Sequence, residues 1–392
     1  MNKEQILQEA GALLESICAH RRWLHAHAET GFDLAQTKPY VKAALEEMGY
    51  SVQECGRAGL VTTVGKPGGK VLLLRADMDA LPIAEEAEVP FACPNGRMHA
   101  CGHDMHTAML LGAAKLLKNH ESELSGMVKL MFQPAEELLA GAKDMVANGV
   151  LENPKVDAAI GIHIDSQVPT GKVCYCNKYT NASADVYIIK VQGKGGHGAM
   201  PEKSIDPLLC ACYINIALQE INSREVAGKD MAVITTGKMI SGTKENIIAD
   251  TAQMEGTIRT FDNAVLANVK KRLEEIAKGV GAAFRCKVEV EWPFGCGPNA
   301  NDLTMQENVV RYGSELIGAE NMVLMDPTMG SEDFSYVANE VPSTFMWMGG
   351  RVEDDSLVYP LHHNHMVLNE DAFPIGAAMH AHCAMEWLKE HC

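Results

Sequence analysis

Short runs of consecutive hydrophobic residues alternate with helical patterns up to about residue 180 of the chain. The runs KVLLLRA (70–76), MVKLMFQ (127–133) and DAAIGIHI (157–164) scarcely alternate apolar and polar positions. Such runs are typical of strands that are covered on both faces of a parallel sheet. Stretches with the hydrophobic spacing of a helix, such as HTAMLLGAAKLLKNH (106–120), lie between them. This order predicts an α/β fold built on a mixed, mostly parallel sheet that is flanked by helices.

The pattern changes between residues 182 and 294. Elements are expected there in the order β-α-β-β-α-β, over 185–194, 204–223, 232–240, 251–261, 263–280 and 286–293. This order is that of the ferredoxin-like unit, which forms a complete small α+β domain. After Pro293 the α/β pattern resumes, with a strand expected at 345–350 and a closing helix from Phe373. We therefore predict a discontinuous large domain, 1–181 and 295–392, with a smaller domain inserted at 182–294.

Composition and charge narrow the class of protein. The chain has 392 residues, of which 47% are hydrophobic and 22% charged, as expected of a globular enzyme with a sizeable core. Its formal net charge of −17 argues against nucleic acid or an anionic membrane surface as a partner, because no basic tract offsets it. No run approaches the roughly 18 consecutive apolar residues of a membrane span. The first residues form an amphipathic pattern rather than a secretory signal, so the 12 cysteines indicate reduced thiols and a cytoplasmic protein.

Residues with catalytic or metal-binding chemistry follow the predicted strands at the point where each strand ends. Asp77 and Asp79 follow the first hydrophobic run, Glu136 and Glu137 follow the second, and His163 closes the third. In open parallel sheets, ligands bind outside the carboxyl ends of the strands. We therefore expect these side chains to converge at one edge of the sheet.

The run HACGHDMH (99–106) precedes the helix predicted at 106–120, so we expect it to form a loop at the same edge. Cys101 and His103 are its most metal-like pair, because thiolate and imidazole both bind borderline divalent metals. Chance is the alternative, since the chain holds 15 histidines. The Glu-Glu pair has the alternative of a solvated helix face, and the imidazoles of LHHNH (361–365) have that of a polar surface loop.

An ordered set of motifs resembles the co-catalytic metal aminoacylase and carboxypeptidase superfamily, in its branch of hippurate hydrolases and indoleacetyl-amino-acid hydrolases. The motifs run almost end to end, through RRWLHAHAETGFDLAQT, RADMDALPI, HACGHDMHTAMLLGAA, QPAEE, GIHI, GKGGHGAMPE, NIIAD, GTIRTFD, GSEDFSY and LHHNH. One motif alone is weak evidence, whereas the set in this order is specific. The resemblance implies a metallo-exopeptidase-like catalytic domain, an inserted lid and dimerisation domain, and a homodimer or higher homo-oligomer that acts on a small N-acyl-amino acid.

The resemblance also implies a centre of two divalent metal ions per subunit, with zinc, manganese, cobalt and nickel as candidates. Its ligands in this branch are one Cys, one Glu and three His, which correspond here to Cys101, His103, Glu137, His163 and His362. His363 and His365 remain alternatives to His362. Departures from the family pattern at Ala28, Met105 and His363-Asn364 affect the shape of the loops around the pocket, and therefore substrate preference.

The catalytic roles are likewise implied by the resemblance. Glu136 corresponds to the general base and Asp79 to a residue that orients a ligand. His197 corresponds to a residue that, in dimeric relatives, reaches the partner subunit's active site and polarises the substrate carbonyl. Asn246 and Arg259 resemble residues that grip the substrate's amide and carboxylate.

The expected activity is metal-dependent hydrolysis of the amide bond of an N-acyl-amino acid. A dipeptidase or carboxypeptidase with the same two-metal centre is the alternative enzyme, since a peptide is also an acylated amino acid. A non-catalytic metal- or ligand-binding protein is the alternative from another class. The presence of both Glu136 and Glu137 argues against it, because binding alone needs no base. The remaining histidines of interest are expected to be structural or solvated: His20, His25, His27, His380 and His382.

Overall fold

The structure, a computed structural model, describes residues 3–392, and the chain divides into two compact units. Unit 1 comprises the residues up to Thr180 together with Ala300–Pro327 and Asp333–Cys392, and unit 2 comprises Asn181–Asn299 and Thr328–Glu332. Unit 2 thus includes Asn181 and residues 295–299 and 328–332 in addition to the insertion at 182–294 proposed from the sequence. Among the described residues, no helix has both the length and the apolar character needed to cross a membrane.

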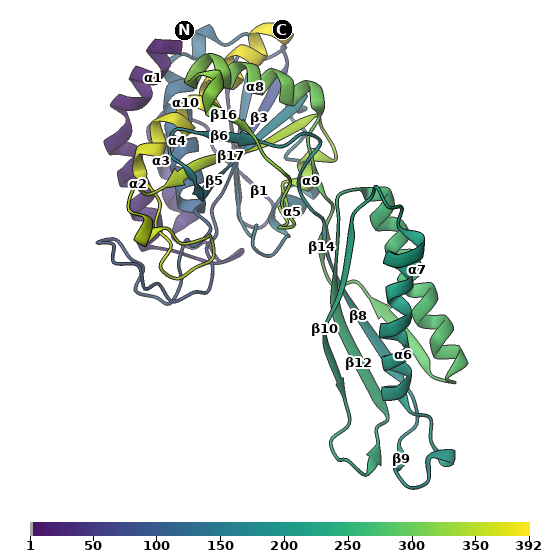
Figure 1. Ribbon diagram of the computed structural model, residues 1–392. Coiled ribbons are helices and arrows are strands. Elements are labelled where there is room, and N and C mark those ends of the chain that lie inside the picture. The colour runs from purple at the N-terminus through teal and green to yellow at the C-terminus, as the bar shows by residue number, and fades with distance from the viewer. Residues whose placement is uncertain (1–2) are drawn as a thin grey trace. The chain divides into compact units, whose positions relative to one another are not determined.

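An eight-stranded mixed sheet forms the centre of unit 1, with the strand order β1-β2-β4-β3-β5-β17-β6-β16 (Figure 1). The four central strands β4, β3, β5 and β17 are parallel to their neighbours in this series, whereas β1, β2 and β6 supply the antiparallel pairs. The strands are β1 Gln53–Cys55, β2 Gly59–Gly65, β3 Val71–Asp77, β4 Met127–Gln133, β5 Ala158–Pro169, β6 Val173–Tyr175, β16 Met322–Leu324 and β17 Ser343–Arg351. The predicted α/β class with a mostly parallel sheet is confirmed.

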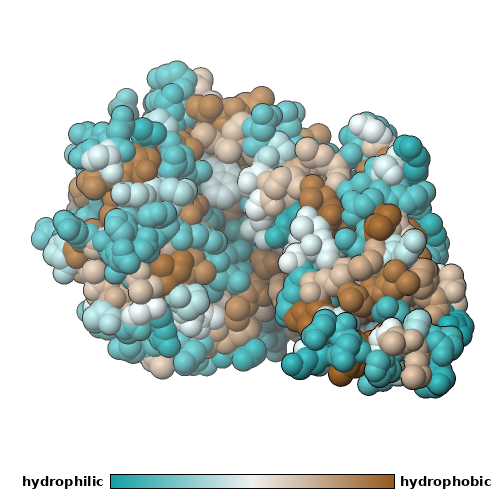
Figure 2. All heavy atoms as spheres, turned by 60° about the horizontal axis from the view of Figure 1, so that its bottom comes forward, coloured by the Kyte–Doolittle hydropathy of each residue, from teal (hydrophilic) through white to brown (hydrophobic). Residues whose placement is uncertain are grey.

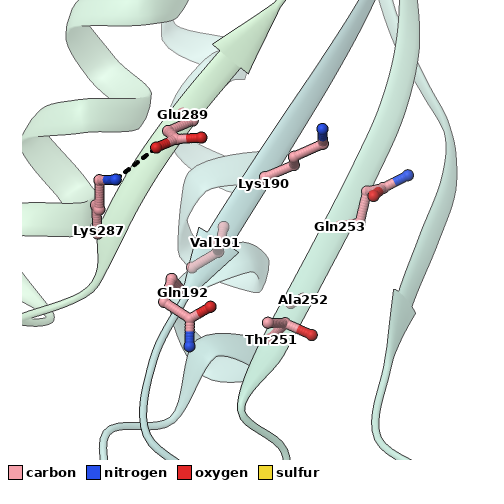
Figure 3. A pocket seen from close by; sticks show the side chains of 8 residues that line it. All are labelled: Lys190, Val191, Gln192, Thr251, Ala252, Gln253, Lys287 and Glu289. Atoms are coloured by element: carbon pink, nitrogen blue, oxygen red, sulfur yellow. Dashed lines mark ion pairs between the residues drawn. The ribbon is translucent and has the colours of Figure 1, made fainter.

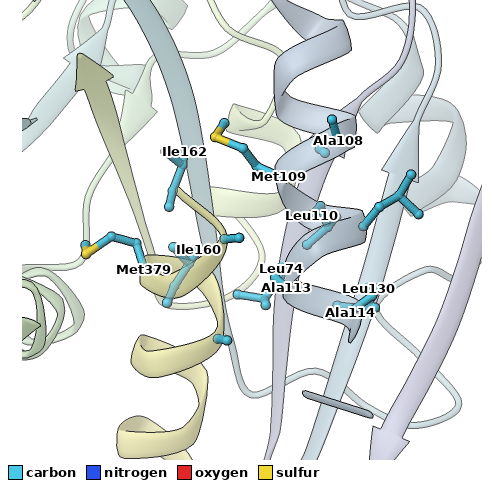
Figure 4. Close-up of a cluster of buried hydrophobic side chains, with 14 of the residues drawn as sticks. Leu74, Ala108, Met109, Leu110, Ala113, Ala114, Leu130, Ile160, Ile162 and Met379 are labelled. Carbon is cyan, nitrogen blue, oxygen red and sulfur yellow. The ribbon is translucent and has the colours of Figure 1, made fainter. Parts of the chain in front are cut away.

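Helices pack on both faces of this sheet, which explains why its strands are almost continuously hydrophobic. Leu72 and Leu74 of β3 belong to a core cluster with α4 and α10, whereas Leu73 points to a second cluster with α5 and α9. Figure 4 shows Leu74, Leu130 and Ile160 of the sheet beside side chains of the two long helices. The helices of unit 1 are α1 Lys3–Ala12, α2 Leu14–Ala26, α3 Thr37–Glu47, α4 His103–Asn119, α5 Gly141–Ala147, α8 Leu303–Ile317, α9 Ser335–Ala338 and α10 Phe373–His391.

Unit 2 is an antiparallel sheet of order β10-β12-β8-β13 with two helices, α6 and α7, that share its core. This is the predicted ferredoxin-like order, and the alternation along β12 buries every second residue. The elements are β8 Ala184–Gln192, β9 Gly196–His197, α6 Pro207–Glu220, β10 Ala232–Ser241, β11 Ile247–Ile248, β12 Thr251–Thr260, α7 Asn263–Ala283, β13 Lys287–Glu291 and β14 Gly295–Cys296. Two short strands, β7 Tyr179–Asn181 and β15 Asn299–Ala300, lie where the chain passes between the units.

Exposed hydrophobic side chains are concentrated in unit 2, and Figure 2 shows hydrophobic atoms at the surface among the hydrophilic ones. On α6, the exposed members are Leu208, Leu209, Tyr213 and Ile216. On β10, an edge strand of the sheet, Val233 and Ile240 are exposed. The β10 residues lie on the face of the sheet opposite the helices, because their neighbours Ile234 and Met239 pack against the core with α6 and α7.

Charged and polar side chains line a hollow of about 300 Å³ on β8, β12 and β13 (Figure 3). Its charged side chains are paired: Lys287 lies 2.6 Å from Glu289, and Lys190 lies 2.6 Å from Glu291. None of the residues that line it belongs to the predicted site.

Candidate metal centre

The carboxyl edge of the central strands brings the predicted site residues of unit 1 together. Asp77, the last residue of β3, is paired in register with Gln133, the last residue of β4. Asp79 and the Glu136–Glu137 pair follow these strand ends directly, and His163 lies on β5, the other neighbour of β3. Residues that are distant in the sequence therefore meet because β3 and β4 end together beside His163. The strand β5 itself continues to Pro169, so His163 does not close it as the sequence pattern predicted.

The loop before α4 places Cys101 and His103 side by side, and here the expectation for HACGHDMH was partly wrong. The helix begins at His103 rather than at His106, so only the first part of this run is a loop. Gly102 caps the helix with a left-handed φ of +82°, and a Cβ at this position would lie 2.4 Å from Ile164 Cγ2. Glycine is therefore required for the tight turn between the two candidate ligands.

The donor atoms of the five predicted ligands lie close together. Cys101 Sγ is 3.4 Å from His163 Nε2 and 3.2 Å from His362 Nε2, and His362 Nε2 is 3.5 Å from Glu137 Oε1. Three overlapping groups have donor atoms within 4.8 Å of one another: Cys101-His103-His163, Cys101-Glu137-His362 and His103-Glu136-Glu137. Cys101 is common to the first two groups.

Backbone geometry distinguishes His362 from its neighbours in LHHNH. His362 has a left-handed φ of +66°, and its N–H donates to the carbonyl of Ala100 at 2.8 Å, which holds it beside Cys101. The ring of His363 instead stacks on Tyr359, at a centroid distance of 4.5 Å. His365 Nδ1 lies 3.1 Å from Asn364 Oδ1 and 3.7 Å from Glu86 Oε2. Of the three imidazoles, the structure brings His362 to the other candidate ligands.

Asp79 holds His103, Glu136 and Glu137 in place but is not itself one of the candidate ligands. Its carboxylate accepts hydrogen bonds from the backbone N–H groups of Glu136 (2.9 Å) and Glu137 (3.3 Å). Its carbonyl oxygen lies 2.8 Å from His103 Nδ1, so a proton on Nδ1 directs Nε2 toward the cluster. Hydrogen bonds of this kind fix the tautomer and orientation of metal ligands.

Burial disfavours the negatively charged forms of the thiol and carboxylate ligands, and a bound cation would favour them. Burial raises the pKa of the Cys101 thiol well above its usual range and raises the pKa of the Glu137 carboxyl to about 7. Burial also holds the pKa of His163 well below its usual value. His103 Nε2 and Glu137 Oε1 are buried without a hydrogen-bond partner. Sulfur, nitrogen and oxygen donors in this arrangement fit borderline divalent ions such as zinc.

Glu136 lies beside the candidate ligands, with Oε2 4.0 Å from His103 Nε2. The backbone N–H of Asp333 donates to Glu136 Oε1 at 3.3 Å. The Asp333 carboxylate is itself held by Gln133 Nε2 (2.6 Å), by Arg75 Nη2 (3.3 Å) and by the N–H of Ala142 (2.9 Å). Asp333 belongs to the motif GSEDFSY, but nothing in the local sequence predicts its contact with Glu136.

The remaining predicted residues belong to unit 2. His197 on β9 is paired with Ile247 on β11, and the N–H of Gly198 donates to the carbonyl of Asn246 at 2.8 Å. His197 and Asn246 are therefore neighbours, and both are exposed. Arg259 is half-buried near the far end of β12, where its Nη1 lies 3.5 Å from the carbonyl oxygen of Ser183. Within unit 2, the structure brings His197 and Asn246 together but does not place Arg259 beside them.

The sequence profile of peptidase family M20/M25/M40 matches residues 73–386. The chain belongs to this family. Among M20 relatives, an IAA-amino acid hydrolase (ILR1-like 4) of Arabidopsis thaliana is 39% identical over 378 residues, which cover 94% of this chain and 85% of the relative. Thermostable carboxypeptidase 1 of Saccharolobus solfataricus is 35% identical and covers 98% of each chain. An N-acetyl-L-cysteine deacetylase of Bacillus subtilis is 36% identical and covers 90% and 83%.

Similar solved structures agree with this assignment. The crystal structure of an aminohydrolase from methicillin-resistant Staphylococcus aureus matches with a TM-score of 0.94 and 33% identity, and covers 99% of this chain and all of its own. The Bacillus subtilis YXEP protein, described as a dinuclear metal binding peptidase from the M20 family, matches with a TM-score of 0.82 and 31% identity and covers 97% and 99%. The resemblance inferred from the motifs and the assignment as a hydrolase of amide bonds are confirmed.

Proposed function

We propose that this M20 protein is a metal-dependent amidohydrolase that cleaves N-acyl-amino acids. One observation carries the proposal: five thiolate, imidazole and carboxylate side chains converge within reach of one another beside a further carboxylate, Glu136. Two of the relatives are named for acyl-amino acid substrates, indoleacetyl-amino acids in one case and N-acetyl-L-cysteine in the other. Both names describe an acyl group that is joined by an amide bond to an amino acid.

Two divalent ions would be held by the five candidate ligands, which are Cys101, His103, Glu137, His163 and His362. When bound, such ions polarise a carbonyl and lower the pKa of water from 15.7 to about 7. Asp79 keeps Glu136 and Glu137 in place through their backbone N–H groups. The N–H of Asp333 fixes one oxygen of Glu136, and its other oxygen, Oε2, is the atom that faces the candidate ligands.

Glu136 would act as the general base in this proposal. Its carboxylate would accept a proton from the attacking water and return it to the nitrogen of the leaving amino acid, so that one side chain serves both halves of the hydrolysis. His197 would donate a hydrogen bond to the developing oxyanion, a contribution typically worth about 10²–10³ in rate. Asn246 and Arg259 would bind the amide and the carboxylate of the substrate.

A homodimer is part of the proposal, because β10 is an edge strand and because α6 carries several exposed apolar side chains. Val233 and Ile240 stand on an edge strand whose outer side pairs with no other strand in the described chain. An exposed edge strand with apolar side chains is a site for strand pairing with another chain. A second copy of the chain would pair with this edge strand and allow His197 to act across the dimer.

The second candidate function is cleavage of peptides by the same centre. The 35% identity to a thermostable carboxypeptidase over 98% of both chains favours it. Peptides and N-acyl-amino acids share the amide bond and the free carboxylate, so they differ only in the group on the acyl side. Retention of Glu136 speaks against a protein that only binds metal.

The test is a substrate panel with chelated protein that is refilled with zinc, manganese, cobalt or nickel in turn. N-acetyl-, benzoyl- and indoleacetyl-amino acids are compared with dipeptides, and the proposal expects the higher kcat/KM among the acyl-amino acids. Glu136→Gln is expected to retain bound metal and to lose about 10²–10⁴ in kcat. Glu340→Gln, which changes an exposed carboxylate, is the matched control. Substantial turnover by Glu136→Gln would remove Glu136 as the base, and higher kcat/KM for dipeptides would favour the peptidase.

A further inference from the structure

The motif RRWLHAHAETGF places two polar side chains in the interior of unit 1, and the proposed catalytic mechanism does not use them. Arg21 and His25, on α2, are 3% and 1% exposed. Buried charged and polar groups require partners, because an unpaired one costs free energy in proportion to the hydration it has lost. The partners of these two side chains lead from α2 to both sides of the candidate metal centre.

The first partner is Asp104, which follows the candidate ligand His103 in the first turn of α4. Arg21 Nε donates a hydrogen bond to Asp104 Oδ2 at 2.8 Å, and His25 Nδ1 lies 2.8 Å from the same oxygen. The Asp104 side chain is fully buried. The turn that carries His103 is therefore fastened to α2 by two hydrogen bonds.

The second partner is Glu85, which lies in a segment without regular secondary structure, residues 84–97. His25 Nε2 lies 2.9 Å from Glu85 Oε1, so a ring with both protons donates to Asp104 and to Glu85 at once. Glu85 Oε2 accepts the N–H of Cys93 at 2.8 Å. The ring of Phe91, from the same segment, packs edge-on against His25 at 5.4 Å. A single imidazole thus contacts the segment near its start, at Glu85, and near its middle, at Phe91.

This segment in turn contacts the loop that carries His362. The N–H of Glu86 donates to the carbonyl of Asn364 at 2.8 Å, and the Glu86 carboxylate lies 3.7 Å from His365 Nδ1. The side chain of His362 is 53% exposed, whereas those of His103 and His163 are buried. Of the three candidate imidazole ligands, His362 therefore has the least packing of its own and depends most on the loops around it.

We propose that His25 and Glu85 are positioning residues for the metal centre, which hold His362 in register with Cys101 through segment 84–97. The inference rests on the proposed function, since it concerns the ions that the centre would bind. Arg21 and Asp104 fix the buried half of the centre, and Glu85 and Glu86 fix the exposed half. His25 joins the two halves, because its two ring nitrogens face Asp104 and Glu85.

The test measures metal binding rather than turnover. Chelated full-length protein is titrated with Co²⁺, followed by calorimetry and by the visible and thiolate-to-cobalt absorption bands. His25→Phe keeps an aromatic ring and removes the hydrogen bonds to both Asp104 and Glu85. Glu85→Gln weakens only the contact between His25 and segment 84–97 and leaves the contact with Asp104 intact. Both variants are expected to lower the affinity of at least one of the two ions by about 10–100-fold, the range typical of residues that orient metal ligands. In Glu85→Gln, the affinity of the other ion is expected to stay within about threefold. His25→Phe also loses the hydrogen bond to Asp104, so the affinity of both ions is expected to fall in that variant.

Two matched controls separate positioning from charge and from general packing. Glu88→Gln removes the same charge from an exposed position of the same segment. His20→Phe removes a histidine of the same helix whose Nδ1 contacts Tyr40. Both controls are expected to bind two ions as the unsubstituted protein does. Far-ultraviolet circular dichroism checks that each variant is folded. If His25→Phe does not fold, the metal affinities of Glu85→Gln alone test the inference.

Unchanged affinity for both ions in a folded Glu85→Gln variant would overturn the inference. An equal loss of affinity for both ions in Glu85→Gln would also overturn it, because Glu85 contacts the half of the centre that contains His362 and not the half that contains His103. Failure of the unsubstituted protein to bind two ions in the same titration would instead refute the proposed two-ion centre, so the two failures are distinguishable.

Discussion

Replacing His380 should reduce the acid sensitivity of unit 1. His380 lies on α10, is 1% exposed, and has no hydrogen-bond partner at either ring nitrogen. Its neighbours along the helix belong to the main hydrophobic core. Burial lowers the pKa of this imidazole from 6.5 to about 3, with a smaller contribution from His106. The ring is therefore neutral in the folded chain at pH values at which it is protonated in the unfolded chain.

The sign and the size of the effect follow from these two pKa values. Between pH 6.5 and pH 3 the unfolded chain binds the additional proton, so the free energy of unfolding falls as the pH falls through this window. The full difference corresponds to about 5 kcal/mol, of which about 2 kcal/mol is lost between pH 7 and pH 5. For a unit of this size, about 2 kcal/mol corresponds to a change of about 3–4 °C in Tm.

The assay is differential scanning calorimetry of chelated protein at pH 7 and pH 5. In His380→Leu, the Tm advantage over the unsubstituted protein is expected to grow by about 3–4 °C when the pH is lowered from 7 to 5. His380→Gln cannot titrate but remains polar, so it should show the same pH dependence with a lower Tm. An advantage that stays constant within about 1 °C between the two pH values would refute the reasoning, because a ring that is buried and neutral must produce the slope.

Three further predictions follow from other parts of the fold. Lys129 donates from Nζ to three backbone carbonyls at 2.7–3.0 Å, so Lys129→Met should lower the free energy of unfolding by about 3 kcal/mol in urea titrations, and a loss below about 1 kcal/mol would contradict this account. Asp262 caps α7 by accepting two backbone N–H groups, and Asp262→Ala should cost about 1 kcal/mol by the same measurement, with no change expected in kcat. If His197 acts across a dimer, inactive His197→Ala mixed with inactive Glu136→Gln should regain activity after subunit exchange; no recovery after demonstrated exchange would count against sharing.

The pattern of hydrophobic residues was sufficient to locate the strands and helices that build the site. Continuous apolar runs at 127–133 and 157–164 became β4 and β5, because strands covered on both faces need no polar alternation. Alternation at 251–261 became β12, whose second face is polar. Local sequence carries this information because side-chain burial repeats with the period of each element.

The helix α4 begins earlier than the hydrophobic pattern predicts. The hydrophobic pattern begins at His106, whereas the helix begins at His103. The difference arises from Gly102, whose left-handed backbone allows the chain to turn directly into the helix against Ile164 of β5. The spacing of the residues around Gly102 does not contain this packing contact, since Ile164 is distant in the sequence.

The sequence by itself determined the residue types of the candidate site, their order and the strands beside which they lie. Tertiary structure decided which histidine of LHHNH meets Cys101, because that choice depends on a left-handed φ at His362 and a hydrogen bond to Ala100. It also decided that His25 lies between two carboxylates and that His380 lies in an apolar core. Such facts come from contacts between segments far apart in the chain, and no pattern within one segment specifies them.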